Sequence, residues 1–191
     1  MHFRSLVAVA LSAITVVAGS LDQRALCKVK PKVPGYPVDL GACLCDKQAN
    51  FIVDKFKSIL TNPDRTAAKT TAETLIAESY VEESDSINIL AGYPLGGPSF
   101  ASKQLFIDGV AAAPAIPSMD TLEVFHDCTR ISWRWNVKGL GLNKYPVKGF
   151  NSFTVDPCTG QIKLSYIEFS SIAWGSDIGW TCTPPSGPPP S

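Results

Sequence analysis

The chain has 191 residues, and its 17 lysines and arginines equal its 17 aspartates and glutamates in number. The lack of net charge, and of any basic cluster longer than residues 28–32, argues against nucleic-acid binding and against attraction to an anionic membrane surface. The length and the apolar content indicate one domain with a sizeable core.

The first twenty residues have the pattern of a secretory signal peptide. Arg4 precedes an uncharged apolar run at residues 6–18, and small residues follow at 18–20, where a signal peptidase would cut. A helix that crosses a bilayer needs ~20 apolar residues, and this run is shorter. We therefore expect residues 1–20 to be removed and the mature chain, from about Leu21, to be secreted.

Proline-rich segments flank the central part of the chain. Residues 21–42 include Pro31, Pro34 and Pro37 and show no apolar period, which predicts an extended N-terminal arm. Residues 183–191 are mostly proline, serine and glycine, and this composition predicts a disordered tail. The folded domain is therefore expected at residues 43–182.

An even number of cysteines in a chain predicted to be secreted indicates disulfides. The six are Cys27, Cys43, Cys45, Cys128, Cys158 and Cys182. An expected hairpin would bring Cys128 near Cys158, Cys182 would then pair with Cys43 or Cys45, and Cys27 would hold the arm. Cys43 and Cys45 could also form a zinc site with His126 and Cys128. Disulfides are the favoured interpretation in an oxidising compartment, and no metal is expected.

Apolar spacing and capping residues predict three helices in the first part of the chain. The first begins at Asp46, which is expected to cap it, and ends at residues 62–63. The second covers residues 65–78 after the capping residue Asp64. A short strand is predicted at residues 80–87, and a third helix at 102–110 with Leu105 among its inward-facing residues.

Alternating apolar and polar residues predict three long strands in the last third, at residues 123–137, 145–155 and 161–174. In the first of these, the odd positions, among them Asp127 and Ile131, would face the core, while His126 would face away. A symmetric turn near residues 139–143 would put Asn151 on the inner face, opposite Ile131. A bulge would shift the register by one residue and turn His126 inward.

Seven segments resemble the secreted NTF2-like (SnoaL-like) proteins of filamentous fungi. They are LTNPDR at 60–65, SDSIN at 84–88, AGYPLG at 91–96, FHDC at 125–128, WRW at 133–135, YPVKGFN at 145–151 and SIAWG at 171–175. The resemblance implies an α+β cone, in which a curved antiparallel sheet packs on about three N-terminal helices and encloses a pocket. It implies no established activity.

Residues 121–126 and 172–175 are more distantly similar to scytalone dehydratases, which use pocket histidines. By that resemblance His126 would be a general base, with Asp85 or Asp127 orienting its ring. Glu168 and Asn151 would complete this candidate catalytic group. The second histidine of those enzymes has no counterpart, because the only other histidine is in the signal peptide. The alternative interpretation is a partly exposed histidine and a structural ion pair.

Six residues are predicted to line a small-molecule pocket, with the glycine- and proline-rich loop around the first of them as its rim. They are Tyr93, Asp127, Trp133, Trp135, Phe153 and Tyr166. The favoured hypothesis is a secreted protein that holds a small apolar or aromatic molecule without a cofactor. The alternatives are a cyclase, isomerase or dehydratase, and an interaction protein or homodimer that uses the outer sheet face around Arg130 and Arg134.

Overall fold

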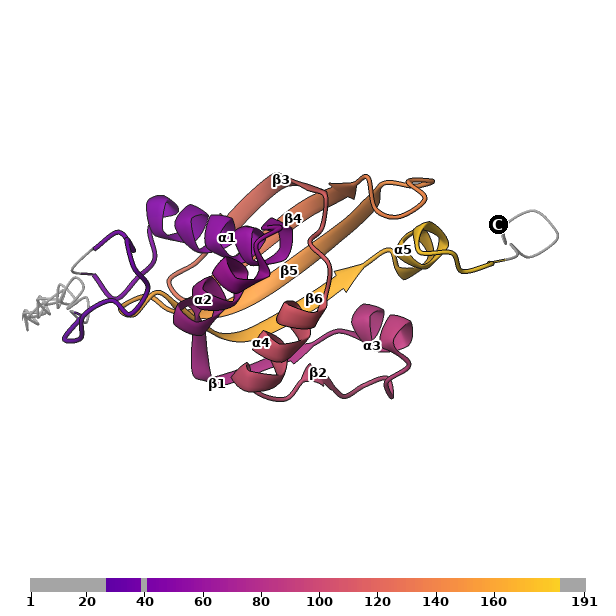
Figure 1. Cartoon of the computed structure of the whole chain (residues 1–191). Helices are drawn as coiled ribbons and strands as arrows, with labels where there is room; N and C mark the ends of the chain where they lie inside the picture. Colours follow the sequence, from indigo (N-terminus) through magenta and orange to yellow (C-terminus); the bar gives the residue numbers. More distant parts are fainter. Residues whose placement is uncertain (1–26, 39–40, 183–191) are drawn as a thin grey trace, which may run out of the picture.

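The computed structural model describes residues 27–38 and 41–182, so the expected signal peptide and C-terminal tail lie outside the described residues. This part of the chain forms one six-stranded sheet and five helices (Figure 1). Helices α1 (Asp46–Thr61), α2 (Arg65–Leu75) and α4 (Lys103–Ala112) cover one face of the sheet. The short helices α3 (Asp85–Ala91) and α5 (Ser171–Asp177) lie together at one end.

The sheet is mixed rather than purely antiparallel. Its strands are β1 (Ile76–Glu83), β2 (Pro98–Phe100), β3 (Ser118–His126), β4 (Arg130–Lys138), β5 (Val147–Asp156) and β6 (Gln161–Phe169), in the spatial order β2-β1-β6-β5-β4-β3. Strands β3 to β6 form an antiparallel meander, whereas β1 pairs in parallel with β6. The long connection from β1 to the meander through α3 and α4 permits this parallel pairing, which a hairpin could not provide.

The strand predicted at residues 123–137 is a hairpin instead, made of β3 and β4. The Asp127 carboxylate accepts hydrogen bonds from the backbone N–H groups of Thr129 and Arg130, both at 2.7 Å, and thereby closes a tight turn. These hydrogen bonds favour a turn at Asp127, although the alternating pattern of residues 123–137 predicts one continuous strand. The reversal puts His126 opposite Ile131 on the inner face, while Asp127 lies in the turn and not in a pocket.

Two other predicted boundaries also move because a serine caps a helix. Ser84 accepts a hydrogen bond from the N–H of Ile87 at 3.0 Å and starts α3, so the strand predicted at 80–87 is β1 and ends at Glu83. Ser170 starts α5 in the same way, and β6 therefore ends at Phe169 rather than at residue 174. The start of α1 at Asp46 is confirmed, but its N-cap residue is Cys45.

The interior between the helices and the sheet is packed with aromatic rings. Phe56 from α1 lies 4.8 Å from Phe153, 5.9 Å from Phe106 and 6.3 Å from Trp133, measured between ring centroids. These four side chains are almost completely buried. The central part of the concavity, where the sequence analysis expected an open cavity, is therefore filled by contacts between α1, α4, β4 and β5.

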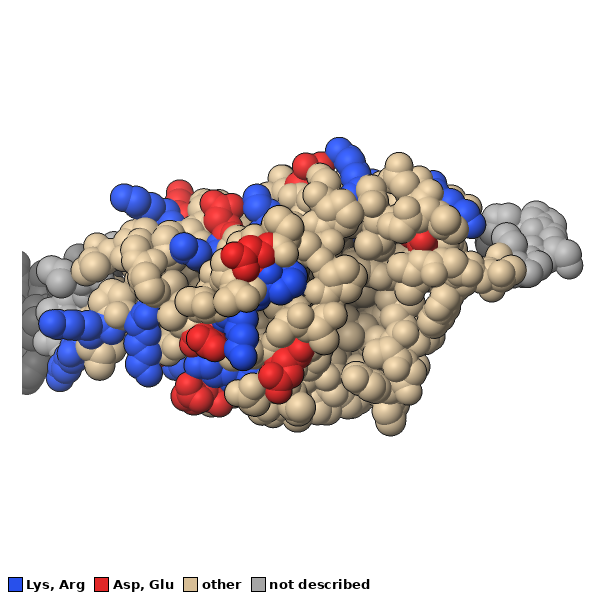
Figure 2. All heavy atoms as spheres, in the orientation of Figure 1, with Lys and Arg blue, Asp and Glu red and all other residues tan. Residues whose placement is uncertain are grey.

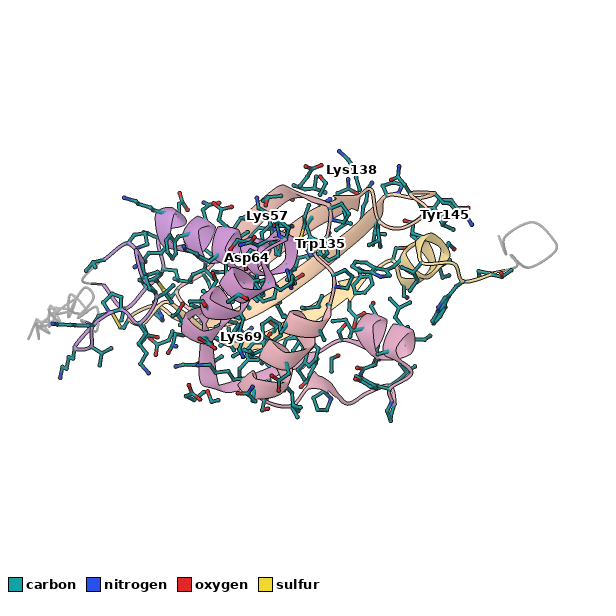
Figure 3. The ribbon with its side chains drawn as sticks, viewed as in Figure 1. Lys57, Asp64, Lys69, Trp135, Lys138 and Tyr145 are labelled. Carbon is teal, nitrogen blue, oxygen red and sulfur yellow. A yellow bond between two sulfur atoms is a disulfide. The ribbon has the colours of Figure 1, made fainter. Side chains whose placement is uncertain are left out.

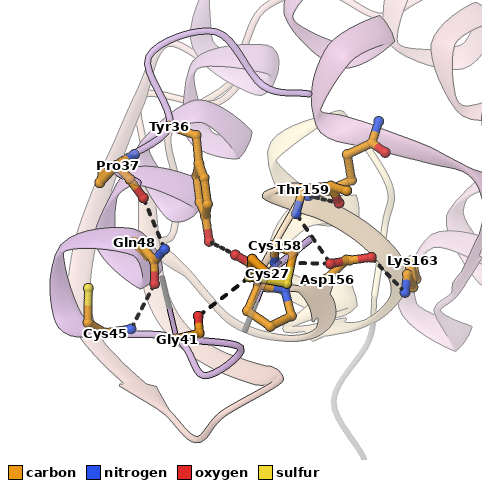
Figure 4. The surroundings of a disulfide bond; sticks show 12 residues. Cys27, Tyr36, Pro37, Gly41, Cys45, Gln48, Asp156, Cys158, Thr159 and Lys163 are labelled. Carbon is orange, nitrogen blue, oxygen red and sulfur yellow. Dashed lines mark hydrogen bonds and ion pairs between the residues drawn. A yellow bond between two sulfur atoms is a disulfide. The ribbon is translucent and has the colours of Figure 1, made fainter. Parts of the chain in front are cut away.

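The structure pairs the cysteines differently from the sequence-based expectation. Cys27 is bonded to Cys158, which ties the N-terminal arm to the turn between β5 and β6 (Figure 4). Cys43 is bonded to Cys128. The hairpin turn at residues 127–129 explains the second bond, because the Cys128 carbonyl accepts a hydrogen bond from the Leu44 N–H at 3.0 Å. Two of the three sulfurs of the considered zinc site, those of Cys43 and Cys128, are thus bound to each other in a disulfide.

Cys45 and Cys182 remain as free thiols. Cys45 precedes α1 beside the β3–β4 turn, whereas the chain reaches Cys182 from α5, at the opposite end of β5. A ten-residue strand is about 30 Å long, so the two thiols cannot meet within one molecule.

Candidate functional site

A groove of about 540 Å³ lies at the edge of the sheet, between α4 and the loop that joins α3 to β2. Its wall includes Tyr93, Pro94, Ser99, Phe100, Leu105 and Gly109. This volume is within the range of about 300–1,000 Å³ that is common for small-molecule sites. Leu105, expected to face the core, is instead 53% exposed and forms part of the apolar wall.

A buried asparagine fixes the loop that forms the rim of the groove. The Asn88 side-chain amide donates hydrogen bonds to the carbonyls of Gly97, at 2.9 Å, and Pro94, at 3.3 Å. The backbone passes through a left-handed conformation at Gly92, where φ is 73°, as is common for the residue that ends a helix. These constraints hold Tyr93 at the mouth of the groove, the position at which the sequence analysis placed it.

Behind the groove the inner face of the sheet carries a buried carboxyl group. Glu82 on β1 is 1% exposed, and its Oε2 accepts a hydrogen bond of 2.6 Å from the Tyr80 hydroxyl. Glu82 makes no ion pair with any lysine or arginine of the described residues. Glutamate is almost never fully buried unless it is paired, so this group is a candidate functional residue.

Burial raises the pKa values of both Glu82 and Tyr80. It raises the pKa of Glu82 to about 7, although the hydrogen bond from Tyr80 acts in the opposite direction. Burial and the neighbouring carboxyl group also raise the pKa of Tyr80. Ser165 on β6 lies directly across the parallel pair from Glu82 and is fully buried. Near neutral pH, Glu82 therefore exchanges a proton more readily than an exposed glutamate would.

Phe100 separates the groove from Glu82. It is the cross-strand partner of Glu82 in the β1–β2 pair, and residues directly opposite in such a pair share one face of the sheet. Its ring lines the groove and also contacts Phe106, at 5.8 Å between centroids. The ring lies against Gly109, where an added Cβ would come within 2.6 Å of a ring carbon. The lack of a side chain at residue 109 therefore makes room for this ring.

His126, the predicted general base, lies far from this groove, on the opposite edge strand β3. Its Nε2 is 2.8 Å from a carboxylate oxygen of Asp46, at the start of α1, and its Nδ1 is 3.2 Å from the Asp127 carbonyl oxygen. The Asp46 carboxylate raises the pKa of His126. The observed partner of His126 is thus Asp46 rather than Asp85 or Asp127.

Asp85 and Glu168 meet at α3, but in capping roles. The Glu168 carboxylate accepts hydrogen bonds from the N–H groups of Asp85, at 2.9 Å, and Ser86, at 3.1 Å, and from the Ser86 hydroxyl. The Asp85 carboxylate accepts a hydrogen bond of 2.7 Å from the N–H of Gly96 in the groove loop. The structure therefore does not bring His126 together with these two carboxylates.

The remaining predicted residues divide between the core and the surface. Trp133 and Phe153 belong to the packed interior, and Asn151 is buried on the inner face, as predicted. Asn151 accepts a hydrogen bond of 2.6 Å from the indole N–H of Trp135, which lies on the sheet beside the helical layer (Figure 3). Tyr166 is 47% exposed on the outer face. Of the six predicted pocket residues, only Tyr93 lines the groove.

The surface around the groove carries few charges. Figure 2 shows lysine, arginine, aspartate and glutamate gathered over α1, α2, α4 and the N-terminal arm, with a few beside α5, while the part that carries α3 is almost free of them. On the outer face of the sheet, Arg134 forms an ion pair of 2.7 Å with Glu123. Few charged side chains therefore surround the groove rim at this end of the molecule.

A second hollow, of about 440 Å³, lies beside the Cys27–Cys158 disulfide and is lined in part by Tyr36 and Val38. The described residues contain no group of three or more histidine, cysteine or acidic side chains placed to hold a metal ion. None of their helices is both long and apolar enough to cross a bilayer.

The sequence analysis missed Glu82, Tyr80 and Phe100. Tyr80 and Glu82 lie within the strand predicted at residues 80–87 and share one face of it, but the expected polar face of that strand gave no sign that Glu82 is buried. Phe100 belongs to a three-residue strand that no alternating pattern can reveal. An acidic residue on the apolar side of β1 was the one available signal.

The match to a known family agrees with this architecture. The NTF2-like domain family matches residues 42–181, which is most of the 191-residue chain. The protein therefore belongs to the NTF2-like domain family. No curated protein matches the chain.

Solved structures share the fold at low sequence identity. IdmH from Streptomyces antibioticus, a proposed polyketide cyclase, is 15% identical over 70% of this chain and 99% of that chain, with a TM-score of 0.51. A loop-truncated variant of IdmH is 16% identical over 69% and 99%, with a TM-score of 0.52. An LEH-like epoxide hydrolase from M. tuberculosis is 14% identical over 69% and 89%, with a TM-score of 0.50. At these identities the similarity shows the fold alone.

Proposed function

We propose that this protein binds a small apolar or aromatic molecule in the groove between α4 and the α3–β2 loop. The observation that carries the proposal is the groove itself, whose apolar wall is held in place by the buried Asn88 and stays open although the core beside it is closely packed. Exposed Tyr93 and Leu105 at its mouth provide apolar contact area for a flat ligand.

Titration with naphthalene, followed by the backbone amide signals in an NMR spectrum, tests this proposal. We expect saturable shifts at Tyr93, Ser99 and Leu105. Leu105→Glu places a charge on the wall and should weaken binding at least about tenfold, because an apolar ligand cannot pair with it. Ile172→Glu is the matched control, since Ile172 is 67% exposed on α5 and does not line the groove. Equal binding by both variants would contradict the proposal.

A second candidate function is general acid–base catalysis on a molecule bound in the same groove. The buried Glu82 favours it, because a carboxyl group with a pKa near 7 can both take up and release a proton at neutral pH. IdmH, described as a proposed polyketide cyclase, and the LEH-like epoxide hydrolase make such chemistry a reasonable proposal for this fold. In this candidate Glu82, rather than His126, carries the proton.

We also propose that the protein is secreted. The support is the signal-peptide pattern of residues 1–20 together with the two disulfides, which form and persist in oxidising compartments.

A further inference from the structure

We infer that Glu82 is the polar end of the groove's binding site and that it recognises a ligand with a protonated amine on an apolar body. This inference rests on the proposed function and adds the chemical class of the ligand. The amine would reach Glu82 past the Phe100 ring, while the apolar body would stay in the groove against Leu105 and Tyr93.

The first argument is the position of Phe100 between the two parts of the site. The ring forms part of the groove wall, and the Phe100 backbone is paired with that of Glu82. Strand β2 is only three residues long, lies at the edge of the sheet, and has two register pairs with β1. The Phe100 ring is also partly exposed. A rotation of this ring toward the groove, away from its contact with Phe106, would uncover Glu82.

The second argument is that Glu82 lacks a positive partner. The elements packed on β1 are β2, β6, α2 and α4. Strand β2 has no charged residue, Lys103 of α4 pairs with Glu78, Lys163 of β6 pairs with Asp156, and Arg65 of α2 donates to three backbone carbonyls. The other titratable groups on these elements are Lys69, Glu73, Asp108, Tyr166 and Glu168, and none of them affects the protonation of Glu82.

A buried carboxylate without a cation is costly, and a ligand ammonium group would offset part of that cost by forming an ion pair inside the protein. A ligand with only a carbonyl group would need the protonated form of Glu82 instead. The two ligand classes therefore predict opposite effects of pH on affinity. Asp108 is the other carboxylate on the groove wall, so the test must separate it from Glu82.

The experiment compares three probes of one shape, 2-methylnaphthalene, 2-naphthylmethanol and 2-naphthylmethylamine, by calorimetric titration of the full chain at several pH values. An alkyl amine stays protonated between pH 6 and pH 8, whereas Glu82, with a pKa of about 7, loses its proton over that range. The affinity for the amine should rise about tenfold from pH 6 to pH 8, and at pH 8 it should exceed that for the methyl compound at least about tenfold.

Three variants identify the group that is responsible. Glu82→Gln keeps the size of the side chain and should abolish both the amine preference and its pH dependence. Glu83→Gln, on the exposed neighbour of Glu82, should leave both effects unchanged, and Asp108→Asn, on the groove wall, should leave the pH dependence between pH 6 and pH 8 unchanged. Phe100→Ala should speed association of the amine, because it removes the ring between the groove and Glu82.

The outcomes separate this inference from the proposed function. Equal affinity for the three probes at every pH, or loss of the amine preference in Asp108→Asn but not in Glu82→Gln, would overturn the role of Glu82 and leave the groove as a binding site. Tighter binding of the alcohol as the pH falls would also overturn it. If none of the probes binds, the proposed function itself is wrong.

Discussion

At the scale of single residues, Glu82 and Glu83 show how environment sets chemistry. They are adjacent in one strand, but the two-residue period of a strand sends one side chain into the core and the other to the outer face. The inner one lies against Tyr80 and Ser165 and is shielded from water, while the outer one is solvated. The difference between Glu82 and Glu83 therefore comes from their positions in the fold, because the two residues are of the same type.

The raised pKa of Glu82 predicts how stability depends on pH. The folded state holds this proton up to about pH 7, whereas the unfolded chain releases it near 4.5, so the free energy of unfolding falls as the pH rises between these values. At about 1.4 kcal/mol per pH unit, the loss is roughly 3 kcal/mol. Urea denaturation at pH 4.5 and 7.5 should show a loss about 3 kcal/mol larger in the wild type than in Glu82→Gln, because the raised pKa of His126 lowers stability with rising pH in both proteins. Parallel changes in the two proteins would contradict the assignment.

At the scale of elements, side chains that bond to the backbone set the boundaries. Asp127 closes the β3–β4 turn, and Ser84 and Ser170 start helices where the apolar pattern continues as a strand. Glu168 on β6 also helps to start α3, because its carboxylate accepts hydrogen bonds from the first N–H groups of that helix. The groove rim depends on α3, since Asn88 of that helix holds the loop that follows.

Glu168→Ala should therefore loosen α3 together with the groove loop. Removing a helix cap typically costs about 1 kcal/mol, and we expect a loss of that size in the free energy of unfolding. Hydrogen exchange should accelerate at residues 85–97 and remain unchanged in β4 and β5. The exposed Glu73 on α2 provides the control variant, Glu73→Ala. Unchanged exchange at residues 85–97 would show that Glu168 does not organise the rim.

At the scale of the whole molecule, the two disulfides attach the N-terminal arm and the start of α1 to the same end of the sheet. They close loops of 131 and 85 residues. In the chain-entropy model each such bond stabilises the fold by about 4–5 kcal/mol. The free thiols Cys45 and Cys182 remain, at opposite ends of β5.

Peptide mass spectrometry of the protein recovered from culture medium, under non-reducing conditions, tests this arrangement. We expect linked peptides for Cys27–Cys158 and Cys43–Cys128, alkylation of Cys45 and Cys182, and an N-terminus near Leu21. A peptide that links Cys128 to Cys158 would instead support the pairing expected from the sequence.

The sequence by itself determined the α+β class, the first two helices and the inward position of Asn151, because periodicity and capping act over neighbouring residues. The tertiary structure decided the parallel β1–β6 pair, the disulfide partners, the burial of Glu82 and the position of Phe100 in front of it. Each of these depends on segments far apart in the chain lying side by side, and local patterns carry no information about which segments meet.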